Sequence, residues 1–209
     1  YNLTQEQLSH TLMPVGAYTK DQIRAFAEEA GLPVAHKPDS QEICFVPDGD
    51  YAKFIEENSG KKIPEGNFVW TDGTVIGKHK GITHYTIGQR KGLGLSLKES
   101  MYVVAVDPVK NQVILGKNDD LFSRELVAND VNLISVDHIE GEMRVKAKVR
   151  YRHEEQWATV TQPEPDKIRV VFDEPQRAIT CGQAVVLYDG DVVVGGATII
   201  ETEIAKQYS

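Results

Sequence analysis

The sequence predicts a mainly β protein with a short α-helical N-terminal segment, a small central β-rich domain and a C-terminal antiparallel β-barrel. Three observations support this. Helix-capping patterns occupy the N-terminal part, hairpin signatures the middle part, and a succession of short apolar strands separated by turns the last part. We expect domains at residues 1–50, 51–122 and 123–209.

The N-terminal segment carries two capping boxes, in which a threonine precedes a glutamine by three positions. They are Thr4 with Gln7 and Thr19 with Gln22. A helix is expected after the second box and should end at Gly31. Its apolar residues recur at helical spacing, which predicts a packing role: Ile23, Phe26, Ala27 and Ala30.

A loop over residues 36–41 is expected to lead into a short apolar strand over 43–46, followed by a helix over 50–57. Cys44 lies in this strand. A cysteine between two large apolar residues is commonly a small core residue, but the polar run 39–42 before it favours a position near a site. Both interpretations of Cys44 stay open on these residues alone.

The remaining residues alternate between apolar runs and turn signals. Segments 68–70 and 74–76 flank Asp72-Gly73 and predict a hairpin, and segments 101–106 and 112–115 predict a second strand pair. Further strands are expected at 144–151, 157–161, 168–172, 184–188 and 192–200.

Composition sets limits on class. With 209 residues, 41% of them hydrophobic and 26% charged, the chain is typical of a soluble globular protein. No apolar run approaches the ~18 residues of a membrane helix, so no membrane partner is expected. Two cysteines without Cys-x-x-Cys or paired histidines predict neither a disulfide framework nor a metal site, and favour a cytoplasmic location. Because the chain opens on Tyr1 in a helix-like stretch, we expect it to be part of a longer protein.

A net charge of −8 argues against a nucleic-acid partner, but the cations are unevenly distributed. Residues 144–153 read R-V-K-A-K-V-R-Y-R-H, so that five cations alternate with apolar residues. On a strand they would form one cationic face, which favours anion binding. The alternative is the solvated outer face of a barrel strand. The five are Arg144, Lys146, Lys148, Arg150 and Arg152.

A second basic window covers residues 73–98, which contain no acidic residue. Its glycines would let backbone approach a ligand closely, although G-Q-R-K-G-L-G is a weak match to nucleotide-binding loops. It suits a phosphate backbone better. Ordinary turns with incidental lysines are the alternative. The basic residues are Lys78, Lys80, Arg90, Lys91 and Lys98, with His79 and His84.

Four segments together resemble the tRNA-specific 2-thiouridylases, from Tyr1 to about Glu201. They are D-S-Q-E-I-C-F-V, G-K-H-K-G-I-T-H-Y-T-I-G-Q-R-K-G-L-G, V-R-Y-R, and G-Q-A-V-V-L-Y-D-G-D-V-V-V-G-G-A-T-I-I. The resemblance implies an enzyme that adenylates the wobble uridine of tRNA with ATP and then transfers a persulfide sulfur to it. Cys44 matches the second of the family's two cysteines, and a sulfur-relay donor protein is implied as partner.

The resemblance also implies that Arg150, Tyr151 and Gln183 contact tRNA. Arg152, one position after Tyr151, is a further candidate. Arg150 and Tyr151 would point to opposite faces of an ideal strand, so both can reach RNA only at a strand end or bulge. Cys181 is read as an incidental small residue that does not pair with Cys44.

No S-G-G-x-D-S loop for ATP and no first cysteine occur in the sequence. ATP is therefore expected to bind a missing N-terminal domain, and this chain is expected to be inactive alone. A stand-alone RNA-binding module with a structural cysteine is the main alternative. A thiol hydrolase or peroxidase would need a histidine or arginine dedicated to Cys44, and neither His36 nor His79 can be nominated.

Overall fold

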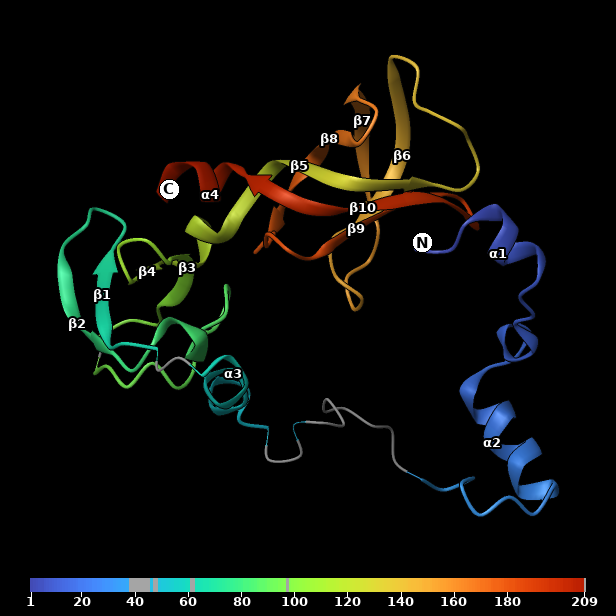
Figure 1. Cartoon of the computed structure of the whole chain (residues 1–209), viewed down its shortest axis with the longest axis horizontal. Coiled ribbons are helices and arrows are strands. Elements are labelled where there is room, and N and C mark those ends of the chain that lie inside the picture. The colour runs from blue at the N-terminus through green and yellow to red at the C-terminus, as the bar shows by residue number, and fades with distance from the viewer. Residues whose placement is uncertain (38–45, 47–48, 61–62, 97, 209) are drawn as a thin grey trace.

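The computed structural model describes residues 1–37, 46, 49–60, 63–96 and 98–208. A helical N-terminal segment is followed by a small mixed sheet and then by a closed six-stranded barrel (Figure 1). The predicted mainly β fold, with its C-terminal antiparallel barrel, is confirmed.

Both predicted capping boxes form. The Thr4 hydroxyl accepts from the Gln7 N–H at 3.2 Å, and the Gln7 side chain accepts from the Thr4 N–H at 2.9 Å. Thr19 and Gln22 repeat this arrangement. They begin α1 (Gln5–Ser9) and α2 (Lys20–Glu29), with a 3-10 turn, η1 (Pro14–Ala17), between them. Gly31, at φ +65°, follows α2 as expected.

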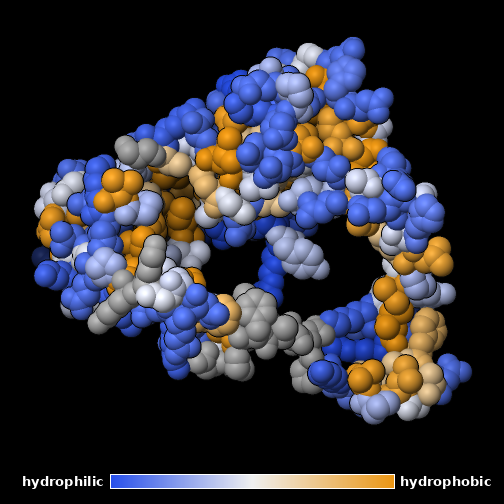
Figure 2. Space-filling model, in the orientation of Figure 1, coloured by the Kyte–Doolittle hydropathy of each residue, from blue (hydrophilic) through white to orange (hydrophobic). Residues whose placement is uncertain are grey.

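We expected α2 to pack against the rest of the protein. This prediction is wrong for the described part of the chain, because no residue of α2 is buried there. Phe26 is 47% exposed and meets only the edge of Tyr18 among described aromatic rings, with centroids 5.1 Å apart. Apolar side chains remain uncovered along this segment (Figure 2). They are Leu12, Met13, Val15, Tyr18, Phe26, Leu32 and Val34.

The start of the chain is nevertheless fixed to the barrel. Asn132 Nδ2 donates to the carbonyl oxygens of Tyr1 and Leu3, and Gln5 Nε2 donates to that of Ile134. A Cβ at Gly196 would lie 2.6 Å from the Tyr1 ring, so the close contact requires glycine there. These contacts attach α1 to the end of the barrel opposite α4 (Figure 1).

The predicted helix near residue 50 is confirmed as α3 (Tyr51–Ser59), capped by Asp50, whose carboxylate accepts from the Lys53 N–H at 3.0 Å. The expected strand over 43–46 lies outside the described residues except for Val46, which is buried. Cys44 is therefore not described.

The central sheet has the order β2-β1-β4-β3. Its strands are β1 (Gly66–Trp70), β2 (Val75–His79), β3 (Tyr102–Asp107) and β4 (Gln112–Gly116). Both predicted hairpins form, and Gly73 supplies the positive φ of the first turn, at +85°. β1 and β4 pair in parallel, a long-range contact that no local pattern indicates. A 3-10 turn, η2 (Ile82–His84), follows β2.

The barrel has the order β10-β5-β8-β7-β6-β9 and closes from β9 back to β10. All five predicted strands are present, but β6 ends at Lys148, before the predicted end at Tyr151. A sixth strand, β5, was not predicted, because polar residues break its alternation. The strands are β5 (Phe122–Leu133), β6 (Glu142–Lys148), β7 (Gln156–Glu164), β8 (Lys167–Arg177), β9 (Ala184–Asp189) and β10 (Val192–Thr202).

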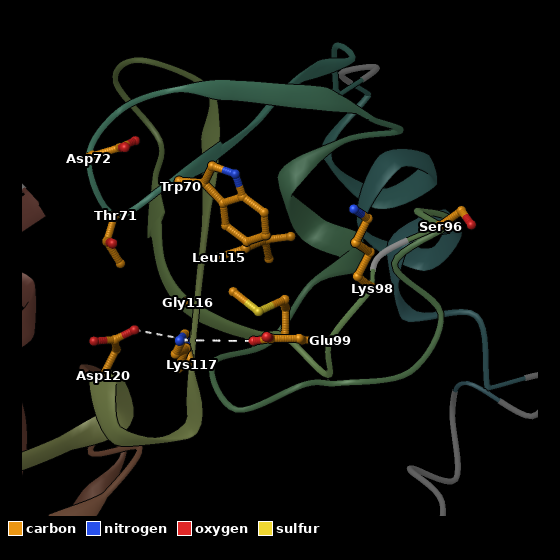
Figure 3. A pocket seen from close by; sticks show the side chains of 11 residues that line it. Trp70, Thr71, Asp72, Ser96, Lys98, Glu99, Leu115, Gly116, Lys117 and Asp120 are labelled. Carbon is orange, nitrogen blue, oxygen red and sulfur yellow. Dashed lines mark hydrogen bonds and ion pairs between the residues drawn. The ribbon is translucent and has the colours of Figure 1, made fainter.

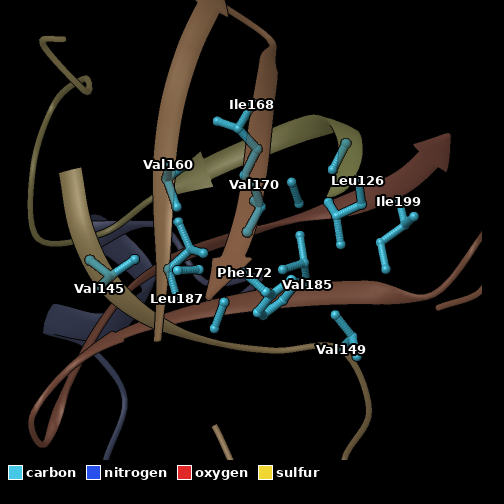
Figure 4. Close-up of a cluster of buried hydrophobic side chains, with 14 of the residues drawn as sticks. Leu126, Val145, Val149, Val160, Ile168, Val170, Phe172, Val185, Leu187 and Ile199 are labelled. Carbon is cyan, nitrogen blue, oxygen red and sulfur yellow. The ribbon is translucent and has the colours of Figure 1, made fainter. Parts of the chain in front are cut away.

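Alternate residues of these strands fill the barrel with aliphatic side chains and Phe172 (Figure 4). Val145, Ala147 and Val149 point inward and are at most 3% exposed, so the predicted period of two is correct for the apolar half of this segment. The cations between them face outward.

A separate apolar cluster joins the barrel to the central sheet. It includes Val104 and Ile114 of the sheet, Ala178 after β8, and Ile204 of the C-terminal helix α4 (Glu203–Tyr208). Leu121, in the 3-10 turn η3 (Asn118–Leu121), accepts a hydrogen bond from the Ala178 N–H at 2.7 Å. The two β units thus share a packed boundary. No helix in the described part of the chain is long and apolar enough to cross a membrane.

Candidate nucleic-acid interface

The end of β6 determines how the predicted RNA-contacting residues point. Val149 and Arg150 form a bend, and Tyr151 and Arg152 a turn, which the His153 N–H closes by donating to the Arg150 carbonyl oxygen at 3.1 Å. The regular alternation of side chains between the two faces of the strand stops here, so Arg150 and Tyr151 need not point in opposite directions. The strand end required for both residues to reach one ligand is present.

Arg150, Tyr151 and Gln183 line one pocket of about 280 Å³, although 32 positions separate Tyr151 from Gln183. Lys148 and Tyr188 line it as well. Pairing between β6 and β9 brings the two segments together. Arg152 is exposed on the same turn but does not line the pocket.

Tyr151 is 94% exposed, so its ring is free to contact a ligand. A ring in this position can stack on an unpaired base, since every base presents a π face. The Gln183 amide nearby can both donate and accept hydrogen bonds. The pocket therefore brings together a ring for stacking, an amide for hydrogen bonding and cationic side chains.

Arg150 is partly committed to the fold. Its Nη2 donates to the Ala178 carbonyl oxygen at 2.7 Å and to Thr180 Oγ1 at 3.3 Å, while its Nε is buried without a partner among described residues. Burial, followed by repulsion from Arg177, lowers the pKa of the Arg150 guanidinium. Arg150 thus braces the loop before β9 as well as lining the pocket.

The predicted uncompensated cation row is corrected by the structure. Arg144 forms a two-pronged ion pair with Asp173 of β8 and lies over the Trp157 ring, 5.2 Å from its centroid. Lys146 pairs with Glu155 at 3.7 Å. Neighbouring segments therefore supply acids to the first half of the row, and only its far end, at Lys148 and beyond, remains without a described ion pair.

The second basic window contains both exposed cations and a structural histidine. The five lysines and arginines are exposed and have no ion pair among described residues. His79 is 2% exposed; its Nδ1 accepts from the Gly81 N–H at 3.1 Å and its Nε2 donates to the Asn111 carbonyl oxygen at 3.2 Å. Burial lowers the His79 pKa, which favours this neutral tautomer. Both ring nitrogens of His79 are therefore engaged in hydrogen bonds within the central unit.

A larger hollow, about 690 Å³, lies in the central unit between Trp70, Met101 and Lys98 (Figure 3). Lys117 contacts two acidic residues of this hollow: its Nζ is 3.9 Å from Glu99 Oε2, and its backbone N–H donates to Asp120 Oδ2 at 2.7 Å. It brings together none of the predicted site residues.

Cys181 is exposed at the turn before β9, and its thiol donates weakly to the Ile200 carbonyl oxygen at 3.4 Å. Partial desolvation raises the Cys181 pKa, which disfavours the reactive thiolate. In the described part of the chain, no three His, Cys, Asp or Glu side chains are grouped as metal ligands.

Comparison with known proteins identifies the family over most of the chain. Family models match residues 1–48 (tRNA methyl transferase HUP domain), 52–117 (tRNA methyl transferase PRC-barrel domain) and 123–199 (aminomethyltransferase beta-barrel domain). The tRNA-specific 2-thiouridylase of Acetivibrio thermocellus is 60% identical over 199 residues, which cover 95% of this chain and 55% of that protein. The chain belongs to the tRNA-specific 2-thiouridylase family.

Other 2-thiouridylases are similarly close. The 2-thiouridylase of Clostridioides difficile is 56% identical over 95% of this chain and 55% of that protein. The 2-thiouridylase of Lachnoclostridium phytofermentans is 55% identical over 96% of this chain and 56% of that protein. The chain thus spans about half the length of the curated 2-thiouridylases that it matches.

Two residues beside the pocket were missed from the sequence. Arg177 ends β8 and repels Arg150, and His153 closes the turn after β6. A single arginine after Asp173 and Glu174 gives no local signal, because its cationic neighbours lie more than twenty positions earlier. His153 is the last residue of the run 144–153 but was not counted among its cations.

Proposed function

We propose that this chain is the tRNA-binding and sulfur-transferring part of an enzyme that 2-thiolates the wobble uridine of tRNA. One observation carries the proposal: the exposed ring of Tyr151 adjoins a pocket that Arg150 and Gln183 also line. These are the three residues that the family resemblance assigns to tRNA. The names of the relatives support the same substrate.

In this proposal, RNA binds at the end of the barrel where β6 stops. Tyr151 stacks on an unpaired base, Gln183 hydrogen-bonds a base edge or ribose, and Arg150 and Arg152 approach phosphates. Such an arrangement selects a loop over a duplex, because paired bases offer no free face to Tyr151. An anticodon loop satisfies this requirement.

Cys44 is proposed to carry the sulfur as a persulfide received from a sulfur-relay donor protein. Its outer sulfur attacks C2 of a uridine already activated at O2, so a C–S bond forms as the activated oxygen leaves. A second thiol then attacks the inner Cys44 sulfur and breaks the S–S bond. The products are 2-thiouridine and a disulfide that includes Cys44.

The resemblance implies ATP as a cofactor, but the described residues contain no glycine-rich loop that could bind its phosphates. The glycine-bearing stretch 88–94 precedes no helix whose N-terminal N–H groups could hold phosphates. We therefore assign ATP-dependent adenylation to the part of the relatives that this chain does not match. The exposed apolar side chains around α2 are consistent with a neighbouring domain that covers them.

The proposal is tested by replacing each cysteine in the cellular protein. Cys44→Ser should abolish 2-thiouridine in tRNA, measured by nucleoside mass spectrometry, while tRNA affinity stays within a few fold. Cys181→Ser is the matched control and should leave thiolation intact. Normal 2-thiouridine levels in the Cys44→Ser strain would favour an RNA-binding module with a structural cysteine, and slow alkylation of Cys44 at neutral pH would point the same way.

A further inference from the structure

Four cationic or titratable side chains converge beside the Tyr151 pocket. Lys148 and Arg150 flank the buried Val149 at the end of β6, and the turn closed by His153 follows. Arg177 arrives from the end of β8. The charges of Arg150, Arg177 and Lys148 all act on His153 and, after the larger effect of burial, lower its pKa.

The acids that offset the other cations of β6, Asp173 and Glu155, form their described ion pairs with Arg144 and Lys146 instead of with this group. Among described residues, no ion pair within 4.0 Å involves any of the four side chains. Glu155 pairs with Lys146 at 3.7 Å, and its pKa is lowered by Lys146 and by Lys148. Positive charge therefore accumulates at the junction between the barrel and the central sheet.

Neutral groups hold the two guanidinium groups in place. Arg150 donates to the Ala178 carbonyl oxygen, and Arg177 Nε donates to Asn118 Oδ1 at 3.1 Å. The Arg177 guanidinium lies over the Tyr102 ring, 5.2 Å from its centroid. These partners orient the cations and leave their charge uncancelled.

The second basic window reaches the same place. A Cβ built on Gly88 would lie 3.4 Å from Arg177 Nη1 and 3.4 Å from the Ala178 Cβ, so the backbone of this window lies against Arg177. Gly88 has φ +88°, which glycine adopts without strain. The cluster is thus bordered by both β units, and one ligand could contact both.

Like charges held together in a partly desolvated position are unfavourable unless an anion is bound. We propose that Lys148, Arg150, His153 and Arg177 form a site for one RNA backbone phosphate, next to the base bound at Tyr151. This inference rests on the proposed RNA-binding function and adds two residues, His153 and Arg177, to it. The phosphate would take the guanidinium and ammonium donors, and His153 would gain a proton as it binds.

The first test measures the salt dependence of binding to a stem-loop RNA with uridine in its loop. Arg177→Gln should weaken binding and lower the slope of log affinity against log salt by about 0.7, as expected for one lost phosphate contact on a single strand. Arg177→Lys should keep most of the slope. Arg124→Gln removes one exposed charge elsewhere on the barrel and should leave the slope unchanged.

A purely bracing role for Arg177 predicts a different result, in which Arg177→Gln lowers the melting temperature and leaves the slope unchanged; that result would overturn the inference. The proposed function is judged separately through Tyr151. Loss of binding in Tyr151→Ala with an unchanged slope in Arg177→Gln would retain RNA binding and reject the phosphate site.

The second test follows the His153 ring protons by NMR across pH, assigned with His153→Gln. Inorganic phosphate, and separately the stem-loop RNA, should raise the His153 pKa, and Arg177→Gln should reduce this rise. If the wild-type chain does not bind RNA, the phosphate titration still decides the site. A His153 pKa that inorganic phosphate and RNA leave unchanged would falsify the proposal.

Discussion

Arg150 donates a hydrogen bond from Nη2 to the carbonyl oxygen of Ala178, 2.7 Å away, across the end of the barrel. Ala178 has φ +55°, a left-handed conformation that costs a residue with a Cβ about 1–2 kcal/mol. Its N–H donates in turn to Leu121 at the boundary with the central sheet. Arg150 therefore stabilises a strained residue on which the junction depends, and it also lines the pocket proposed to bind RNA.

Arg150→Ala should consequently lower stability as well as RNA affinity. Loss of the bond to Ala178 is expected to reduce the free energy of unfolding by about 1–3 kcal/mol, measured by urea denaturation. Binding to the stem-loop RNA should weaken, and its salt slope should fall by about 1. Arg152→Ala is the matched control: Arg152 is exposed on the same turn, so its loss should affect binding alone. Unchanged stability in Arg150→Ala would refute the bracing role.

Tyr151→Ala should weaken RNA binding with no loss of stability, because the side chain is 94% exposed. Loss of one stacked base is expected to cost about 1–3 kcal/mol of binding free energy. Tyr151→Phe keeps the ring and should bind nearly as well as the wild type. The measurement is fluorescence anisotropy with the stem-loop and with a blunt duplex of the same stem. Equal losses on both RNAs would argue against stacking on an unpaired base.

His79 should make stability depend on pH. Its pKa is lowered in the folded protein below the ordinary value of 6.5, so the unfolded chain binds the proton more readily. Stability should be fully present above about pH 6.5 and decrease as pH falls toward the folded pKa. In His79→Gln this decrease should be smaller, as measured by urea denaturation from pH 7.5 to about 5.

His153 also has a lowered pKa and contributes with the same sign, so His153→Gln is the control that isolates its share. A His79→Gln variant whose stability changes with pH as steeply as the wild type would show that His79 does not titrate in this range.

Asp173→Asn tests whether the first half of the β6 cation row meets RNA. The substitution releases Arg144 from its ion pair on an exposed surface, where such pairs contribute little, so thermal stability should change little. If RNA binds only around Tyr151, the affinity and salt slope should stay at wild-type values. A steeper salt slope in this variant would extend the RNA interface along β6.

The sequence by itself determined the local features of this protein. The capping boxes at Thr4 and Thr19, the turn at Gly73 and the inward alternation of Val145, Ala147 and Val149 depend on residues a few positions apart. The four motifs at residues 39–46, 77–94, 149–152 and 182–200 together predicted the family. Local rules also indicated that Arg150 and Tyr151 require a strand end to act together.

Only the tertiary structure decided which charges remain free. Asp173 approaches Arg144 from another strand, and Arg177 joins Arg150 from a segment more than twenty positions away. The parallel pairing of β1 with β4 and the strand β5 likewise depend on partners distant in sequence. Electrostatic interactions depend on distance in space rather than along the chain, so the row of cations read from the sequence became one neutralised half and one positive end.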